Sequence, residues 1–406
     1  MVTNYGQLTY CTNIHGGEQW DEHFESLKTH FPAIKKAVSP SQPMGVGLRL
    51  ADMASQTLIE PARLAEFKDW LTEVEGYVFT MNGFPFGAFH GTAVKENVHT
   101  PDWTTTRRLQ YTKRLFDILA QLVPEDREGG ISTSPLGYRH IYNQDEMTWL
   151  DMRKRATSHI VDMVAHLYRI REEKGRDLHL DIEPEPDGVL ETGDEFIAWY
   201  ADELVPEGVQ ILSDQLGITS AEAERAIKHH IRLCYDVCHF ALGYEDHSAV
   251  IDALAQQGIQ IGKFQISAAI KALMPADTEA RKAIGNAFMA FDEPTYLHQV
   301  IAKHRDGRLT RFKDLPEART GLLDMQVSEW RSHFHVPIFL ENLGDLKSTQ
   351  SDILQVLGIH QYSRQTNHLE VETYTWGVLP EQLQLPIAES ISRELNWVLD
   401  QFTDHR

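Results

Sequence analysis

The stretch LHLDIEPEP at residues 178–186 decides the fold. In an extended strand alternate side chains share a face, so the polar odd-numbered residues lie on one side and the apolar even-numbered ones on the other. The apolar side is suited to packing against helices, and the row His179, Asp181 and Glu183 is expected to enter a barrel. Burying such a row costs free energy unless a metal or a dense hydrogen-bonded network partners it.

Seven more β-type runs alternate with amphipathic segments, the pattern of parallel strands joined by crossover helices. The eight expected strands span residues 8–12, 44–50, 77–82, 130–134, 178–183, 232–236, 261–266 and 368–374. The expected helices span residues 59–75, 107–122, 147–173, 194–216, 221–230, 248–257, 349–357 and 381–402. Eight βα units in 406 residues indicate an α/β fold of the (β/α)8 TIM-barrel type. A doubly wound sheet would show a Gly-rich phosphate turn after its first strand.

The interval between the seventh and eighth strands is roughly 100 residues long and predicts an insertion. Two alternating runs flank Asp306-Gly307, which is typical of a β-hairpin, and SHFHVPIF at 332–339 predicts a further strand. Insertions in the βα loops of TIM barrels lie over the carboxyl-terminal face. We therefore expect one domain over residues 1–406, with an insertion at 268–345 that roofs the active site.

Composition favours a small-molecule ligand. The chain has 59 acidic and 38 basic residues, a formal charge of −21, which repels nucleic acids and anionic membranes. No apolar run approaches the ~20 residues of a membrane span, and the first ten residues do not resemble a signal peptide. Three cysteines are typical of a reduced compartment, so the expected location is the cytoplasm.

Three strands deliver carboxylates to their carboxyl ends, where barrel enzymes carry out catalysis: Glu183, Asp236 and Glu372. Converging carboxylates repel one another unless a cation or a shared proton intervenes. Oxygen ligands with one imidazole suit Mn²⁺, Mg²⁺, Co²⁺ or Zn²⁺. The alternative is that these acids pair with Arg or Lys in a structural network. Cys234 and Cys238 lie too far apart on a strand to share one tetrahedral zinc, so they are expected in the core.

These residues also carry a resemblance to known proteins. Glu183-Pro184, Asp236-x-x-His239 and Glu372 resemble the sugar isomerases and epimerases of the xylose-isomerase-like TIM barrels. A resemblance to the EboE family, which is tied to metabolite traffic, covers nearly the whole chain. It rests on the stretches LTYCTNIHGGEQW (8–20), LHLDIEPEPDG (178–188), YDVCHFAL (235–242), HFHVPIF (333–339) and HLEVETYTWGVLP (368–380). Other proteins of the same gene cluster would then be partners.

The resemblance implies roles for single residues. Glu183 and Glu372 would be metal ligands and the acid/base pair, Asp236 a third ligand, and His239 a substrate contact. Where the family has a ligating histidine on the seventh strand, this chain has Gln265, whose amide oxygen suits a hard cation. His335 of the insertion would supply the missing imidazole.

Further candidates for substrate contact come from strand ends and loops, and each has a structural alternative. Asn13 and His15 precede Gly16-Gly17 and otherwise belong to a turn. Arg49 shares a face with two glycines and would hold a substrate anion or pair with a barrel acid. His90 lies in an aromatic loop that would wall a pocket, and Lys263 shares the inward face of Gln265.

The leading hypothesis is a metal-dependent isomerase or epimerase, in which two glutamates move a proton on a small polyhydroxylated or carbonyl compound. A small-molecule carrier that kept the pocket and lost catalysis is the alternative, motivated by Gln265. A multi-metal nuclease is a third possibility that the negative charge disfavours. The sequence contains no G-x-S-x-G, P-loop or HExxH motif.

Overall fold

A nine-stranded sheet forms the centre of the molecule. The computed structural model describes residues 1–90, 94–377, 379 and 384–402. The strands follow one another in the sheet as β1 (Val2–Thr3), β2 (Gly6–Tyr10), β15 (His368–Val371), β8 (Ile261–Ile266), β7 (Ile231–Asp236), β6 (Leu178–Ile182), β5 (Gly129–Thr133), β4 (Gly76–Asn82) and β3 (Met44–Arg49). Neighbours are parallel, except that β1 pairs antiparallel with β2.

The two edges of this sheet curl toward each other. An isolated parallel bridge joins Cys11, just beyond β2, to Gly47 of β3, and Thr9 Oγ1 donates to the Gly45 carbonyl at 2.7 Å. The result is an α/β fold with a nearly closed, barrel-like sheet, as the alternation of strands and helices predicts. The more specific expectation, a complete (β/α)8 TIM barrel, stays a prediction.

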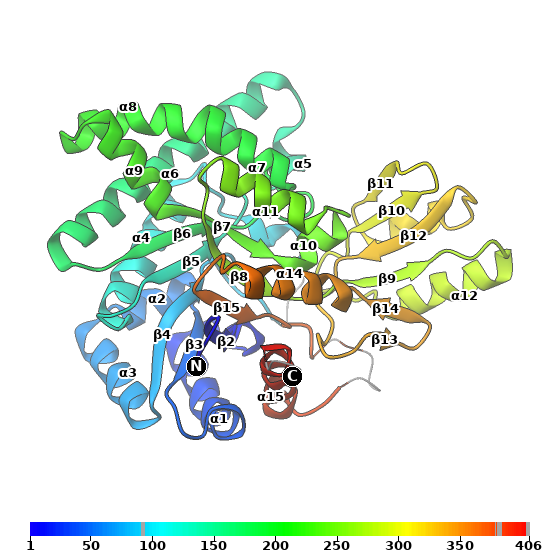
Figure 1. The fold of residues 1–406 in the computed structure, drawn as a ribbon, viewed down its shortest axis with the longest axis horizontal. Helices are drawn as coiled ribbons and strands as arrows, with labels where there is room; N and C mark the ends of the chain where they lie inside the picture. Colours follow the sequence, from blue (N-terminus) through cyan, green and yellow to red (C-terminus); the bar gives the residue numbers. More distant parts are fainter. Residues whose placement is uncertain (91–93, 378, 380–383, 403–406) are drawn as a thin grey trace.

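Most of the helices lie around this sheet, and the others lie beside a second sheet (Figure 1). They are α1 (Trp20–Val38), α2 (Asp52–Leu58), α3 (Pro61–Glu73), α4 (Thr106–Leu122), α5 (Arg139–Tyr142), α6 (Glu146–Lys174), α7 (Gly193–Trp199), α8 (Val205–Leu216), α9 (Ser220–His230), α10 (Val237–Leu242), α11 (His247–Gln256), α12 (Thr278–Met289), α13 (Leu315–Ala318), α14 (Gln350–Tyr362) and α15 (Ile387–Phe402). A π-helical turn at Tyr200–Leu204 joins α7 to α8. Part of the helix expected at 381–402, residues 381–383, lies outside the described residues. Within the part of the chain that the structure describes, no helix is both long and apolar enough to cross a membrane.

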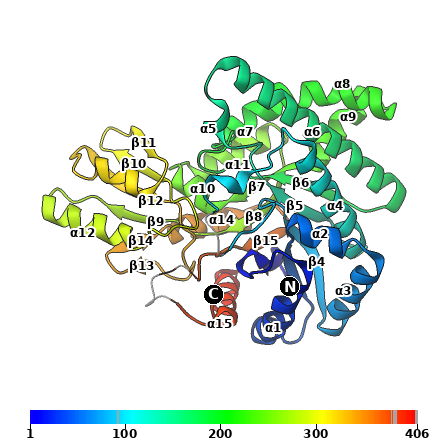
Figure 2. The same cartoon turned by 180° about the vertical axis from the view of Figure 1, so that it is seen from behind.

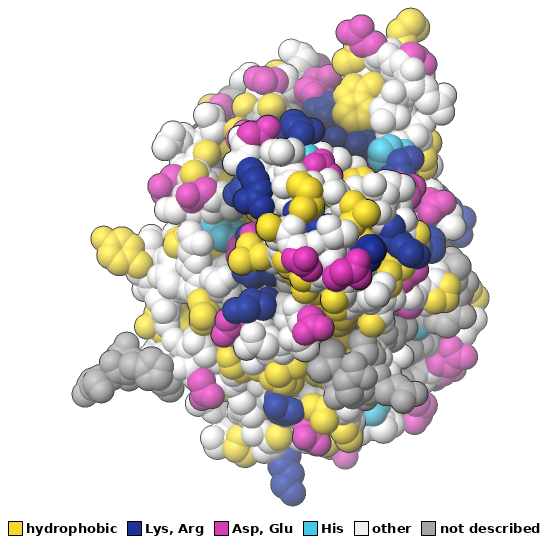
Figure 3. Space-filling view, turned by 90° about the vertical axis from the view of Figure 1, so that its right-hand side faces the viewer, with side chains coloured by type: hydrophobic (Ala, Val, Ile, Leu, Met, Phe, Trp, Pro, Cys, Tyr) yellow, Lys and Arg dark blue, Asp and Glu magenta, His cyan; other side chains and the backbone are white. Residues whose placement is uncertain are grey.

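A second sheet lies beside the first in both views of the ribbon (Figures 1 and 2). Its antiparallel strands are β11 (Leu309–Phe312), β10 (Val300–His304), β12 (Val327–Ser332), β9 (Ile270–Leu273), β14 (Leu346–Ser348) and β13 (Asn342–Leu343). The hairpin expected around Asp306-Gly307 is confirmed as β10 and β11, with Gly307 at a φ of 87°. Basic and acidic side chains are interspersed on the face that Figure 3 shows. The limits 268–345 of the insertion and its function as a roof stay predictions.

The strand expected at 332–339 is wrong, because β12 ends at Ser332. Beyond it, His333 N donates to the Gln299 carbonyl at 2.8 Å and Val336 N to the Ala268 carbonyl at 3.0 Å, and Pro337 has no N–H to offer. These bonds lead to two different segments, so no ladder continues. The irregular segment instead carries His333 and His335 to the end of the central sheet.

Glu394 of α15 gives a prediction on stability. Its Oε1 accepts from Thr373 Oγ1 at 2.7 Å and Ile338 N at 3.2 Å, and burial raises its pKa from 4.5 to about 7. The folded chain therefore keeps a proton that the unfolded chain has lost, so the free energy of unfolding falls as pH rises from about 4.5 to 7. At 1.36 kcal/mol per pKa unit, this loss is about 3 kcal/mol.

Glu394→Gln mimics the protonated acid and removes this loss. We expect the variant to unfold like wild type near pH 4.5 and to be more stable by up to ~3 kcal/mol at pH 8, as measured by urea unfolding at both pH values. The exposed Glu389 on the same helix supplies the control Glu389→Gln. An equal difference at both pH values would contradict the prediction.

Candidate active site

Three carboxylates meet at the carboxyl ends of the central strands. Asp236 ends β7, while Glu183 and Glu372 follow β6 and β15. The register pairs Asp236 with Gln265 of β8, and Gln265 with Glu370 of β15, so these strands end at a common level. One oxygen from each of the three acids lies within 4.8 Å of the others, and all three side chains are buried. The structure therefore assembles the acidic trio that the strand pattern predicts.

Asp236 is anchored mainly through one carboxylate oxygen, Oδ1. Its Oδ1 accepts from Ser267 Oγ at 2.5 Å and from the Cys238 and His239 backbone N–H groups at 2.8 and 3.3 Å, which caps α10. Oδ2 faces the other acids. Burial alone would raise the pKa of Asp236, but His239, His335 and the hydrogen bonds outweigh it, and the pKa is lowered. Asp236 is therefore the member of the trio that stays ionised.

The pKa values of the two glutamates are shifted in the opposite direction. Burial, and then repulsion from neighbouring carboxylates, raises the pKa of Glu183 and of Glu372 well above the usual range. Glu372 Oε1 accepts from Asn13 Nδ2 at 2.6 Å and Asn82 Nδ2 at 3.0 Å, which fixes its orientation. Glu183 Oε2 is buried and has no hydrogen-bond partner among the described residues. A proton or a cation would stabilise both groups.

Gln265 lies between the acids. Its Nε2 donates to Glu183 Oε1 at 3.1 Å, to Asp236 Oδ2 at 3.2 Å and to Glu372 Oε2. Its Oε1 faces away and lies 3.6 Å from Cys234 Sγ. The amide thus presents its donor to the carboxylates, and a role as metal ligand would require the amide to turn. Ligation by Gln265 stays a prediction.

Two imidazoles complete the cluster. His239 Nδ1 donates to the Pro184 carbonyl at 2.9 Å, and His335 Nδ1 donates to the Glu372 carbonyl at 3.0 Å. Because a carbonyl oxygen only accepts, both rings carry a proton on Nδ1, so Nε2 is the nitrogen that each ring could offer to a metal. These Nε2 atoms lie 3.8 and 3.9 Å from Asp236 Oδ2.

This donor set fits a divalent metal ion. Ligand atoms of Asp236, His239 and His335 all lie within 4.8 Å of one another, as do those of the acidic trio, and Asp236 belongs to both groups. His335 Nε2, like Glu183 Oε2, is buried without a partner among the described residues. Carboxylates and neutral imidazoles are the ligands that Mn²⁺, Co²⁺ and Zn²⁺ take in proteins. The sequence resemblance made His239 a substrate contact, whereas the geometry makes it equally available as a ligand.

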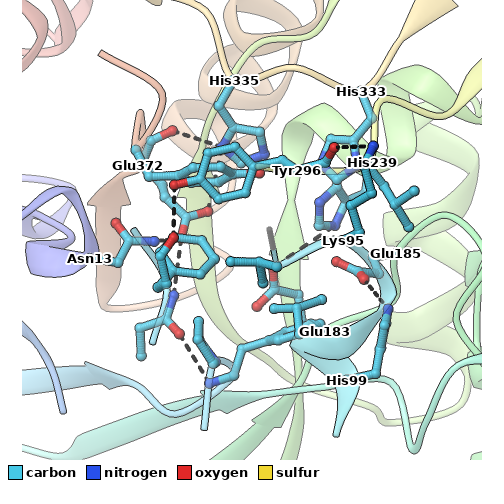
Figure 4. A pocket seen from close by; sticks show the side chains of 18 of the residues that line it. Asn13, Lys95, His99, Glu183, Glu185, His239, Tyr296, His333, His335 and Glu372 are labelled. Atoms are coloured by element: carbon cyan, nitrogen blue, oxygen red, sulfur yellow. Dashed lines mark hydrogen bonds and ion pairs between the residues drawn. The ribbon is translucent and has the colours of Figure 1, made fainter. Parts of the chain in front are cut away.

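A pocket opens beside the glutamates, which point into it together with His335 and His239 (Figure 4). Phe89, Tyr296 and Tyr374 form an aromatic wall with ring centroids 5.0 to 5.3 Å apart. Opposite lies the pair His99 Nε2 and Glu185 Oε1, 2.7 Å apart. The lining residues that sequence reasoning did not single out include Asn82, Lys95, Glu185, Tyr296 and Gln299. Asn82 ends a strand, which is a signal that could have identified it, whereas Lys95 begins a short 3-10 helix and Tyr296 lies in a loop, both without a motif.

Of the expected substrate contacts, Asn13 and His239 line the pocket and four others do not. Lys263 lies deeper in the sheet, where its Nζ pairs with Glu370 at 2.5 Å and donates to Ser132 Oγ at 3.0 Å. Lys263 therefore neutralises a barrel acid, and the structure does not bring it to a substrate.

Arg49, His15 and His90 support the pocket from behind. Arg49 donates to the Gly87 carbonyl, and the glycines on its strand make room for other groups, since a Cβ at Gly47 would lie 1.9 Å from Glu370 Oε1. His15 stacks on His30 with ring centroids 5.0 Å apart. His90 Nε2 donates to the Asn13 carbonyl at 2.5 Å and so positions the segment that orients Glu372.

Fold and site together define an α/β protein whose barrel-like sheet carries a buried cluster of carboxylates and imidazoles at its carboxyl end. No family model and no curated protein matches the chain, so the resemblance to the EboE family stays a prediction. Among solved structures, the chain is similar to 3-keto-D-glucoside 4-epimerase YcjR from E. coli in its apo form, with 11% identity, a TM-score of 0.45, and 97% of this chain and 99% of that chain covered. It is also similar to IolI protein with a binding zinc atom, with 12% identity, a TM-score of 0.44, and 98% and 99% covered. Identities this low leave the chemistry to be derived from the side chains of this chain.

Proposed function

We propose that this chain is a metal-dependent isomerase or epimerase on a complete (β/α)8 barrel of the xylose-isomerase-like type. Its substrate is a small polyhydroxylated carbonyl compound. The observation that supports this proposal is the pair of buried glutamates, both with raised pKa, that face one pocket beside Asp236 and two imidazoles. A base and an acid of this kind are what proton transfer beside a carbonyl group needs.

A divalent ion held by Asp236, His335 and the glutamates would polarise the carbonyl oxygen of the substrate and so acidify the neighbouring C–H bond. One glutamate accepts the proton from carbon, and the other returns a proton to the same or the adjacent carbon. Asn13 and Asn82 orient Glu372 for this task through its Oε1. The aromatic wall of Phe89, Tyr296 and Tyr374 excludes water from one side of the substrate.

Proton exchange with solvent tests this function even where the product has not been identified. The protein, loaded with Mn²⁺, Co²⁺ or Zn²⁺, is incubated in D2O with a panel of ketoses, aldoses and keto-glycosides, and ¹H NMR follows loss of the signal beside the carbonyl. We expect metal-dependent deuterium incorporation into at least one compound. Binding of panel compounds without any exchange would contradict catalysis.

The arrangement of Gln265 favours a second candidate, a carrier for a small polar metabolite. One amide nitrogen lies within hydrogen-bond distance of an oxygen of all three acids and so occupies the space between them. A carrier of this kind would bind sugars while holding no metal at the trio. Metal analysis of protein purified without chelator, combined with the exchange assay, separates the two functions.

A further inference from the structure

A second cluster of metal-ligating side chains lies at the opposite end of the central sheet. His179 is the second residue of β6 and His368 the first of β15. Each lies four residues before a glutamate of the active site, which at ~3.3 Å per residue places this cluster about 13 Å below it. The two rings face each other with centroids 5.1 Å apart, and both side chains are fully buried. One carboxylate oxygen of Glu128 and one ring nitrogen of each histidine lie within 4.8 Å of one another.

The histidines are oriented as metal ligands are. Asp181 Oδ1 lies 2.6 Å from His179 Nδ1, and in the neutral tautomer whose Nδ1–H donates to this carboxylate the lone pair lies on Nε2. A carboxylate behind a histidine is the usual support of a ligating imidazole. His179 Nε2 and both ring nitrogens of His368 have no hydrogen-bond partner among the described residues. Buried nitrogens left unpaired cost free energy, and an ion between the rings would remove that cost.

Two glycines of the central sheet make room for His179 and Asp181. A Cβ at Gly130 of β5 would lie 2.3 Å from His179 Cε1, and a Cβ at Gly262 of β8 would lie 1.8 Å from Asp181 Oδ1. Any other residue at either position would displace the histidine or its carboxylate. Glycines on β5 and β8 thus keep the interior open where the His179–Asp181 pair lies.

Glu128 connects the cluster to the surface. Its Oε2 accepts from Arg232 Nη1 at 3.0 Å and its Oε1 from Asn367 Nδ2 at 2.6 Å, and each oxygen keeps a further lone pair. Glu128, Arg232, Thr366 and Asn367 line a surface cavity, and an ion would reach the cluster from there past Glu128. The competing arrangement is a metal-free network in which Arg232 alone balances Glu128.

We propose that His179, His368 and Glu128 bind a second divalent ion of the zinc type, separate from the active site. Two imidazoles and one carboxylate are a common zinc donor set, and water from the cavity would take the fourth position. In the sheet β6 and β15 are separated by β7 and β8. The ion would therefore cross-link strands that do not touch as neighbours, so its role is structural.

Zinc stoichiometry tests the proposal in the full-length Asp236→Asn protein, in which the active-site ligand set is disabled. After demetallation, reloading with Zn²⁺ and desalting, we expect one equivalent by mass spectrometry of the metal, and a Tm raised by at least ~4 °C over the demetallated protein. Adding Glu128→Gln, or separately His368→Asn, should remove one equivalent and abolish the Tm shift. Adding Glu125→Gln, at an exposed acid nearby, should change neither.

Loss of one equivalent in both ligand variants, with the Glu125→Gln protein unchanged, supports the site. The site is overturned if the Asp236→Asn protein holds no zinc, or if either ligand variant keeps its full complement. Each double variant is compared with the Asp236→Asn protein, and the measured quantity is the loss of one equivalent of zinc. The outcome therefore does not depend on whether the active site is catalytic.

Discussion

Glu183→Gln and Glu372→Gln should each lower the rate of solvent proton exchange by at least ~10²-fold, with up to ~10⁴-fold as the expected limit for a lost general acid or base. Glutamine keeps the size of the side chain, and at position 372 it keeps an oxygen that accepts from Asn13 and Asn82, but it carries no exchangeable carboxyl proton. Deuterium incorporation in D2O, followed by ¹H NMR on a compound that the wild type turns over, measures the loss.

Glu245→Gln is the matched control for this experiment. Burial raises the pKa of Glu245 to about 7, and its Oε2 accepts from Gly193 N at 2.9 Å, outside the pocket. This variant should exchange protons at the wild-type rate. Full exchange by Glu372→Gln would remove Glu372 from the mechanism, and equal losses in all three variants would indicate a general effect on folding.

The strand pattern predicted the acidic trio because two simple rules act together. A period of two decides which side chains turn inward, and parallel strands end at one edge of the sheet. Glu183, Asp236 and Glu372 satisfy both rules, so the sequence alone brings them together. Lys263 satisfies the first rule, but it lies two residues before Gln265, the residue of β8 that pairs with Asp236. Depth along a barrel depends on the register between strands, which the sequence of a single strand does not reveal.

Other parts of the fold carry no such local signal. Helix α1 was not expected, and it holds Pro32 in its interior, a residue that ordinarily ends a helix. The segment that carries His335 has the alternation of a strand, yet its backbone hydrogen bonds lead to Gln299 and Ala268 instead of a ladder. Tyr296, in the loop between α12 and β10, reaches the pocket through long-range packing, which spacing cannot predict.

The interior of the central sheet is polar at three levels, and each level balances its charge differently. At the amino end, Arg232 balances Glu128 beside the two histidines, and in the middle Lys263 balances Glu370. At the carboxyl end the described residues supply no Lys or Arg within ion-pair distance of Glu183, Asp236 or Glu372. The level without a built-in cation is the one that opens to the pocket, which favours an exchangeable cation there.

Asp236→Asn should therefore lower the affinity of the active site for Mn²⁺ or Zn²⁺ by more than ~100-fold. Removal of a group that merely supports a ligand costs 10- to 100-fold, and in our proposal Asp236 is a direct ligand, the one residue shared by both candidate donor groups. The amide keeps an oxygen for Ser267 and the α10 cap but loses the charge that attracts the ion. Isothermal titration with each metal, on protein stripped by chelator, measures the change.

Single substitutions in the two donor groups complete the test. Glu372→Gln weakens only the acidic trio, and His335→Gln weakens only the group with two imidazoles, so each should cost less than Asp236→Asn. Ser267→Ala removes the 2.5 Å hydrogen bond to Asp236 Oδ1 and should cost ~10-fold. If Asp236→Asn binds metal as wild type does, neither donor group is the site. If the loss of affinity in Asp236→Asn equals the loss in only one of the single variants, the ion belongs to the donor group of that variant. Substitution of a ligand shared by both groups must cost at least as much affinity as substitution of a residue that serves one group alone.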